Sequence, residues 1–205
     1  MKYQDLYNIL NENTIVQDRM QYFEFIREHL YKYQHLCVGM HNSPFNYSLI
    51  EKESEFPLGT PSGIYGWQTN NMFDAANIDE HWVSRPVINV FTIKETSKYK
   101  FLDDDVIYCK FDKQAFELSK GDDLKHPKIF RELLLANGIG CLRTDQFEGR
   151  QYCGLIKDCI QPIQSFNNTL DVKLWYAILD AIHQCKSKHN DEMIFSIIEN
   201  IVSAK

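Results

Sequence analysis

A histidine and a hydroxyl stand two residues apart at the end of a short apolar run. The run covers residues 36–40, and His41-Asn42-Ser43 follows it directly. Alternate residues of an extended chain point the same way, so we expect the His41 and Ser43 side chains on one side of the strand. An imidazole and a hydroxyl placed in this way suit hydrogen bonding to a sugar. The alternative is a strand-end histidine satisfied by its own backbone.

A second group of residues suited to ligand binding lies at 61–67, in the sequence Pro-Ser-Gly-Ile-Tyr-Gly-Trp. Gly63 and Gly66 flank Tyr65, and glycine permits close approach of the backbone to a ligand. Tyr65 and Trp67 can stack on a planar ring, or they can fill a hydrophobic core. The sequence leaves these two roles open.

The order of these motifs resembles that of the ADP-ribosyltransferase fold, in its diphtheria-toxin-like (His-Tyr-Glu) branch. In that branch a strand ends in His-Gly-(Ser/Thr), as His41-Asn42-Ser43 does with Asn in place of Gly. Gly-x-Tyr follows, here Gly63-Ile64-Tyr65, and then a helix with an alanine pair, here Phe73-Asp74-Ala75-Ala76. A late strand carries the catalytic Glu, and the run that begins at Gln151 is similar in order and spacing. The resemblance covers residues 36–166.

The resemblance implies a mono-ADP-ribosyltransferase, an activity found in bacterial toxins and effectors, with NAD as co-substrate. The nicotinamide–ribose bond breaks through an oxocarbenium-like transition state, so such an enzyme must orient the dinucleotide and stabilise positive charge on the ribose. The ADP-ribose would then pass to a protein or nucleic-acid acceptor. The sequence does not identify that acceptor, because acceptor choice lies in variable loops.

Each matching residue takes a role in this picture. His41 would bond a ribose hydroxyl. The backbone of Asn42 would hold the nicotinamide amide, with Ser43 supporting the same place. Tyr65 would stack on the nicotinamide ring, and Trp67 would line the same binding site. The cofactor-binding residues implied by the resemblance are His41, Asn42, Ser43, Gly63, Tyr65 and Trp67.

The position that corresponds to the catalytic Glu holds Gln151. A neutral amide can bond a ribose hydroxyl, but it cannot offer a full negative charge to the developing cation. Glu148 would supply the carboxylate if the chain turns it inward, so both residues remain candidates for the catalytic set with His41 and Tyr65. With Gln151 in this place, the protein would be a slow or substrate-assisted transferase. Alternatively, it would be a module of the same fold that binds NAD or a protein partner without turnover.

The chain must supply a scaffold for these motifs. It has 205 residues, 44% of them hydrophobic and 24% charged, which suits an enlarged domain with a packed core. We expect an α+β fold in one compact unit. Its ADP-ribosyltransferase-like split antiparallel β core would cover 36–166, with an N-terminal helical segment at 1–35 and a C-terminal helical pair at 167–205.

Periodicity locates the individual elements. Apolar residues at three- and four-residue spacings predict helices at 15–33, 170–182 and 190–201, the last capped by Asn190, and a shorter helix is expected at 3–10. Pro127 opens a further helix at 127–135, which Gly138 closes. Short β-branched runs predict strands at 36–40, 63–67, 86–93, 106–111, 141–143, 152–156 and 160–166. The run at 86–93 is apolar nearly throughout, which predicts burial on both of its faces.

The charge of the chain gives no general attraction to nucleic-acid phosphate or to anionic membrane, because 28 acidic residues outnumber 22 basic ones. NAD is itself anionic, so local cations must hold it, and Arg85, Arg143 and Arg150 are the candidates. No stretch approaches 18 apolar residues and no signal-peptide pattern opens the chain, so no membrane partner is expected. We expect a cytoplasmic location, or delivery into a target cell without a cleavable signal peptide.

Other chemistries find little support in the sequence. There is no P-loop, GxGxxG, HExxH or pair of CxxC motifs, so no metal site is predicted, and the acidic runs at 103–105 and 122–123 are interpreted as solvated loops. The six cysteines stand singly and are expected to be reduced and buried. A nucleophile pair of His81 with Cys109 or Cys141 is the rival outside this fold. The remaining histidines are interpreted as solvated helix-face residues: His29, His35, His126, His183 and His189.

Overall fold

The computed structural model describes residues 17–45, 61–76, 85–144, 151–168, 172–185 and 190–203. These residues form an α+β fold with six α-helices, seven strands and one short 3-10 helix, η3 (Lys157–Cys159). The chain divides into two compact units. The first unit comprises Met1–Pro44, Thr69–Val90 and Gln164–Lys205, and the second comprises Phe45–Gln68 and Phe91–Ile163. The terminal helices therefore share a unit with residues of the expected β core.

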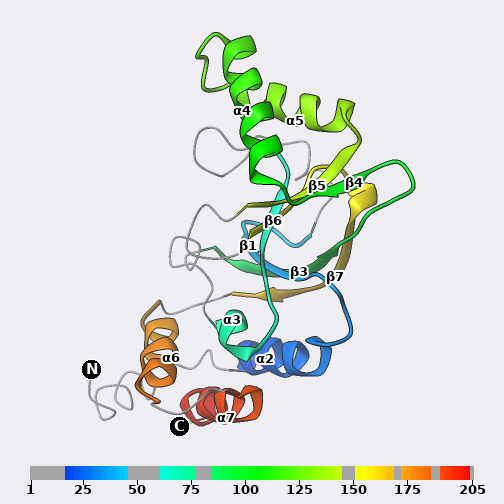
Figure 1. Ribbon diagram of the computed structural model, residues 1–205. Helices are drawn as coiled ribbons and strands as arrows, with labels where there is room; N and C mark the ends of the chain where they lie inside the picture. Colours follow the sequence, from blue (N-terminus) through cyan, green and yellow to red (C-terminus); the bar gives the residue numbers. More distant parts are fainter. Residues whose placement is uncertain are drawn as a thin grey trace. The chain divides into compact units, whose positions relative to one another are not determined.

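Four helices belong to the first unit (Figure 1): α2 (Gln17–His29), α3 (Met72–Ala76), α6 (Val172–Gln184) and α7 (Asp191–Ser203). Aromatic side chains of α2 fill its core, since Tyr22 and Phe23 are fully buried. The Phe23 ring meets Trp175 of α6 edge-on, with ring centroids 5.5 Å apart. The Tyr22 hydroxyl donates to the Ala75 carbonyl of α3 at 3.0 Å. The predicted helices at 15–33, 170–182 and 190–201 are confirmed within the described residues, except that α2 ends at His29 and residues 30–33 lie outside it.

The start of α7 joins several of these helices. The Asn190 Oδ1 accepts the Met193 N–H at 2.8 Å, which confirms the predicted cap. The Asp191 carboxylate accepts the Met72 N–H at the start of α3 at 2.9 Å, and it also accepts the Tyr31 hydroxyl at 2.5 Å. One acidic residue thus satisfies an otherwise unpaired donor at a helix N-terminus and ties α7 to α3.

Three strands contribute to the first unit, in the order β1-β3-β7: β1 (Leu36–His41), the start of β3 (Val87–Ile93) and the end of β7 (Ile160–Asn167). The boundary between the units falls inside β3 and β7. Every residue of β3 is buried, which confirms the prediction made from its near-continuous apolarity. Such a strand has no solvent to satisfy a polar side chain, so any polar residue within it needs a protein partner.

The strands of the second unit run in the order β4-β5-β6-β2: β4 (Lys100–Leu102), β5 (Ile139–Thr144), β6 (Gln151–Gly154) and β2 (Ile64–Gln68). The β5–β6 and β6–β2 pairs are antiparallel, but β4 and β5 are parallel. The expectation of an antiparallel core is therefore wrong for this pair. The physical reason is the long helical connection between β4 and β5, because parallel neighbours need a crossover whereas a hairpin turn would make them antiparallel.

That crossover contains helix α4 (Asp105–Ser119), where a strand at 106–111 was predicted wrongly. Asp104 caps this helix, because its Oδ1 accepts the N–H groups of Val106 at 2.9 Å and Ile107 at 3.1 Å. The β-branched pair Val106-Ile107 suggested a strand, yet these side chains are 80% and 41% exposed. Tyr108 and Ala115 lie on the buried face instead, at helical spacing. The acidic run that begins at Asp103 thus starts a helix.

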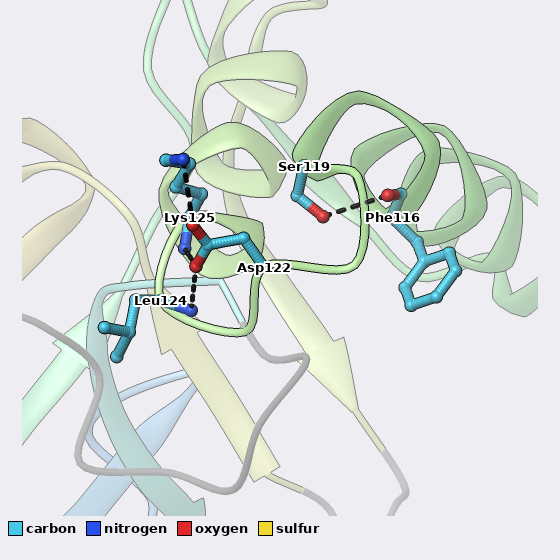
Figure 2. Close-up of polar contacts among 5 residues, drawn as sticks. All are labelled: Phe116, Ser119, Asp122, Leu124 and Lys125. Atoms are coloured by element: carbon cyan, nitrogen blue, oxygen red, sulfur yellow. Dashed lines mark hydrogen bonds and ion pairs between the residues drawn. The ribbon is translucent and has the colours of Figure 1, made fainter.

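Helix α5 (His126–Ala136) follows α4 after a tight turn (Figure 2), and Gly138, at φ +76°, comes just after it as predicted. In the turn, Asp122 Oδ1 accepts the Leu124 N–H at 3.0 Å, and the other carboxylate oxygen lies 2.9 Å from Lys125 Nζ. The Ser119 hydroxyl donates to the Phe116 carbonyl at 2.9 Å. Helices α4 and α5 are in contact, and both belong to the second unit; Figure 1 shows where they lie in the chain.

Two expectations about individual side chains fail here. His126 is only 5% exposed, because the start of α5 packs on α4, and its Nε2 lies 3.1 Å from an Asp112 carboxylate oxygen. It is therefore a buried histidine. Cys109, expected to be buried, is exposed on α4, whereas Cys37, Cys141, Cys153 and Cys159 are buried as expected. The six cysteines are all free thiols, as predicted.

Candidate functional site

His41 stands at the end of β1, half-buried, and its ring is held by the neighbouring strand. Asn89 of β3 places its side-chain Nδ2 at 2.9 Å from His41 Nδ1 and donates from the same nitrogen to the Ser43 carbonyl at 3.1 Å. The Asn89 Oδ1 accepts the Ser165 hydroxyl of β7 at 2.6 Å. A chain of hydrogen bonds thus runs across β7, β3 and β1 to the imidazole.

Asn89 was not singled out from the sequence, although a signal was present. It stands in the middle of the apolar run of β3 and is fully buried. A buried amide costs free energy unless both its donor and its acceptor are satisfied, so an Asn inside such a strand indicates a specific polar partner. Ser165 had no comparable signal, because its role depends on which strand neighbours β3.

The other residues of the first motif lie beside His41 in the first unit. The Asn42 side chain is exposed, and Ser43 is half-buried with its carbonyl bonded to Asn89. The structure therefore brings His41 and Ser43 together through one amide. Strand β1 ends at His41, close to the predicted end, and the imidazole is bonded to a side chain of another strand. Ser43 lies in a bend after the strand, and it is the Ser43 carbonyl that is bonded to Asn89.

Tyr65, on β2 in the second unit, is a core residue. It is 5% exposed and packs with Tyr108 and Phe130 of the α4–α5 hairpin, and its hydroxyl donates to the Pro61 carbonyl. Of the two roles that the sequence left open, core filling is the one its ring has in this structure. Trp67, two residues on, is half-buried and lies on the same face of the sheet as Tyr65.

Gly63 owes its identity to the sheet. A Cβ added there would lie 2.5 Å from the Cys153 sulfur and 2.6 Å from the Gly154 carbonyl oxygen, closer than real Cβ contacts. The close backbone approach expected at this glycine is thus an approach to β6. The sequence was interpreted as permitting close approach to a ligand, whereas in the structure the neighbours of Gly63 are Cys153 and Gly154 of β6.

Gln151 begins β6 and is 2% exposed. It faces Trp67 across the antiparallel pair with β2, and Thr144 across the pair with β5. Opposed residues of an antiparallel pair share a face, so Gln151 and Trp67 are close neighbours. Glu148, the other candidate for the catalytic place, lies outside the described residues.

The sequence-predicted residues therefore form two groups. The first unit holds His41, Asn42 and Ser43, and the second holds Gly63, Tyr65, Trp67 and Gln151.

The candidate cations differ in their surroundings. Arg143 of β5 forms an ion pair with Asp103, with 2.7 Å between Nη2 and Oδ1, so its charge already has a local counter-ion. Arg85 is half-buried, and its carbonyl accepts the Asn168 side-chain N–H at 2.6 Å. Arg150 lies outside the described residues. Of the three, Arg85 belongs to the same unit as His41.

The cysteine rival loses support at Cys141, one of its two candidate thiols. A hydrogen bond with Cys159 and burial raise the pKa of the Cys141 thiol, so it stays protonated and is a poor nucleophile. Burial likewise raises the pKa of Cys153. His81, the proposed partner, lies outside the described residues. Within the described ranges, no three His, Cys, Asp or Glu side chains gather in a way that would hold a metal ion.

Comparison with models of known protein families gives no match, and neither curated proteins nor solved structures match the chain significantly. None of the helices in the described part of the chain combines the length and apolarity needed to cross a bilayer.

Proposed function

We propose that the protein binds NAD through the end of β1 and is a mono-ADP-ribosyltransferase of the diphtheria-toxin-like type. The observation that carries this proposal is the half-buried His41 imidazole, held from behind by the fully buried Asn89 at 2.9 Å. A ring oriented by a buried amide is suited to bonding a ligand hydroxyl in one fixed direction. The Ser43 hydroxyl and the backbone N–H groups at Asn42 and Ser43 would hold the nicotinamide amide.

The order of the remaining motifs supports the same proposal. Strand β2 carries Gly63-Ile64-Tyr65, helix α3 with its alanine pair follows, and Gln151 begins β6. In this proposal Gln151 takes the place of the catalytic Glu. Tyr65 would support β2 from within its core, and the stacking role then falls to another aromatic, for which Trp67 is the candidate on the same strand. The products would be nicotinamide and an ADP-ribosylated protein or nucleic acid.

A second candidate function is NAD binding without turnover, and the character of Gln151 favours it. Its amide is neutral, and its side chain is 2% exposed. Without a carboxylate, the developing oxocarbenium ion lacks the strongest stabilisation that the family resemblance implies. This form of the protein would sense or sequester NAD, or present an NAD-dependent surface to a partner.

Nicotinamide release from NAD distinguishes the two candidates. For the transferase, the wild-type protein releases nicotinamide above the uncatalysed rate, and His41→Ala lowers the rate by about a hundredfold or more. His183→Ala, which changes an exposed histidine of α6, is the matched control and keeps the wild-type rate. For the binding module, none of the proteins releases nicotinamide, yet NAD binds to the wild type and to His183→Ala. If neither release nor binding occurs, both candidates fail.

A further inference from the structure

We infer that Asn89 and Ser165 are positioning residues that fix His41 as the Nε2–H tautomer, so that its imidazole acts as a hydrogen-bond donor at the end of β1. The inference concerns one proton on one ring nitrogen. It deepens the proposed function, on which its ligand assignment rests, but the tautomer itself is tested without any ligand.

The Ser43 carbonyl determines the orientation of the Asn89 amide. One of its side-chain polar atoms lies 3.1 Å from the Ser43 carbonyl oxygen, which can only accept a hydrogen bond. That atom must therefore be Nδ2, since the reversed amide would place two acceptor oxygens against each other. The Ser165 hydroxyl at 2.6 Å then donates to Oδ1. Asn89 thus has one orientation in which its donor and its acceptor are both satisfied.

The Asn89 amide in turn determines which nitrogen of the His41 ring carries the proton. The same Nδ2 lies 2.9 Å from His41 Nδ1 and carries a second hydrogen for it. Because the amide nitrogen can only donate, Nδ1 must accept, and the proton of the neutral imidazole belongs on Nε2. A proton on Nδ1 would face the amide hydrogens directly.

Burial holds the Asn89 amide firmly in this orientation. Asn89 is fully buried in a strand in which all seven residues are buried, so its side chain has no water to exchange with. The amide is bonded on three sides by atoms of β1, β7 and the segment after β1. Buried networks of this kind specify a single geometry when every member is satisfied.

A donor Nε2–H selects its ligand by chemistry. It prefers an acceptor oxygen, such as a ribose hydroxyl of a dinucleotide, and it disfavours a group that can only donate. If the proposed function holds, the Ser165–Asn89–His41 chain presents this donor to the nicotinamide ribose. The roles are distinct, because His41 would touch the ligand whereas Asn89 and Ser165 act through it.

The test is a long-range ¹H–¹⁵N correlation spectrum of the imidazoles in ¹⁵N-labelled protein near neutral pH, with the His41 resonances assigned by their loss in His41→Ala. We expect the wild-type ring to be the Nε2–H tautomer. Asn89→Asp replaces the donor with an acceptor and shifts the proton to Nδ1. Asn89→Leu, similar in shape but without polar atoms, gives a mixture of both tautomers.

Two further proteins keep the experiment decisive. Ser165→Ala removes the donor to the Asn89 Oδ1 and leaves only the Ser43 carbonyl to orient the amide, so it gives at most a partial shift toward the other tautomer. Thr92→Val, a buried polar-to-apolar change on the opposite face of β3, leaves the His41 spectrum unchanged. A wild-type ring protonated on Nδ1 overturns the inference, as does a folded Asn89→Asp protein with an unchanged tautomer.

NAD binding separates this inference from the proposed function. If both hold, Asn89→Leu weakens NAD binding about two- to tenfold, as expected when one hydrogen bond to the ligand is misdirected. If the tautomer is as inferred but wild-type protein does not bind NAD, the positioning role stands and the proposed function fails. If NAD binds to the wild type but the His41 ring carries its proton on Nδ1, the proposed function stands and the positioning role of Asn89 and Ser165 fails.

Discussion

Trp67 and Gln151 are direct partners across the antiparallel pair of β2 and β6, and the Gln151 side chain is 2% exposed. Their side chains share one face of the sheet, because opposed residues of an antiparallel pair point the same way. An aromatic ring and an amide are therefore paired at the strand position where the family resemblance implies a catalytic carboxylate. Substitutions at Gln151 therefore test whether this position contributes to catalysis.

Replacing the amide with a carboxylate should raise the rate of nicotinamide release. We expect Gln151→Glu to release nicotinamide about ten- to a hundredfold faster than wild type, because a full negative charge stabilises the oxocarbenium ion. Burial at this position would raise the pKa of the new carboxyl, so the gain should grow as the pH rises. A steady-state rate measured from pH 5 to pH 8 checks both parts. Gln151→Leu is the uncharged control, and an equal rate for Leu and Glu would refute the carboxylate role.

Gly63→Ala should destabilise the protein by about 1–3 kcal/mol, since its Cβ would lie 2.6 Å from the Gly154 carbonyl oxygen and the backbone of β6 has to move. Urea unfolding gives the free energy. Gly121→Asn is a suitable comparison, because nothing lies within 4 Å of that position and Asn tolerates its φ of +73°. Similar stabilities for Gly63→Ala and wild type would show that β2 and β6 do not pack as described.

Tyr65→Phe should leave NAD chemistry intact while it lowers the free energy of unfolding by about 0.5–1.5 kcal/mol. The variant keeps the ring among Tyr108 and Phe130 and removes only the hydroxyl that donates to the Pro61 carbonyl. Tyr65→Ala is less informative, because loss of a buried aromatic ring costs about 3–5 kcal/mol and would reduce activity through unfolding. A stable Tyr65→Phe protein with strongly reduced NAD affinity would instead give the hydroxyl a direct role at the ligand.

Asp74 of α3 should make stability depend on pH. Burial raises the pKa of this carboxyl and the Asp191 carboxylate raises it further, although hydrogen bonds from Asn70 and Asn71 oppose the shift. A raised pKa means that the folded state holds the proton more tightly than the unfolded chain. The stabilisation is therefore complete below about pH 3.9, the unfolded value, and is lost as the pH rises through the folded pKa.

Asp74→Asn tests this sign, because it removes the charge and keeps an acceptor for the Asn70 N–H. We expect the variant to be more stable than wild type at pH 7 and to lose that advantage near pH 3, as measured by urea unfolding. A variant that is less stable at pH 7 would mean that the hydrogen bonds to the charged carboxylate outweigh its burial.

Parts of this fold were predictable from sequence because the signals are local. The apolar run of β3 predicts a buried strand, and Asn190 predicts the cap of α7. Helix α4 was missed because the β-branched Val106 and Ile107 favour a strand, whereas the burial of Tyr108 on the second unit's core favours a helix. That burial is a tertiary contact, which local propensity does not contain.

The candidate site was predictable to a similar extent. The sequence placed His41 correctly at a strand end, since the end of an apolar run marks the end of the strand. It could not decide the role of Tyr65, because the face on which the ring lies depends on how β2 pairs with β6. The partnership of His41 with Asn89 likewise depends on β1 lying next to β3, which no spacing along the chain reveals.

Binding of NAD at the end of β1 through His41 can be measured by isothermal titration calorimetry. NAD is titrated into the wild-type protein, His41→Ala and His183→Ala. We expect saturable NAD binding to the wild type and to His183→Ala, and binding weakened at least tenfold in a folded His41→Ala protein. The absence of NAD binding to the wild type, or equal affinity in wild type and His41→Ala, would contradict it.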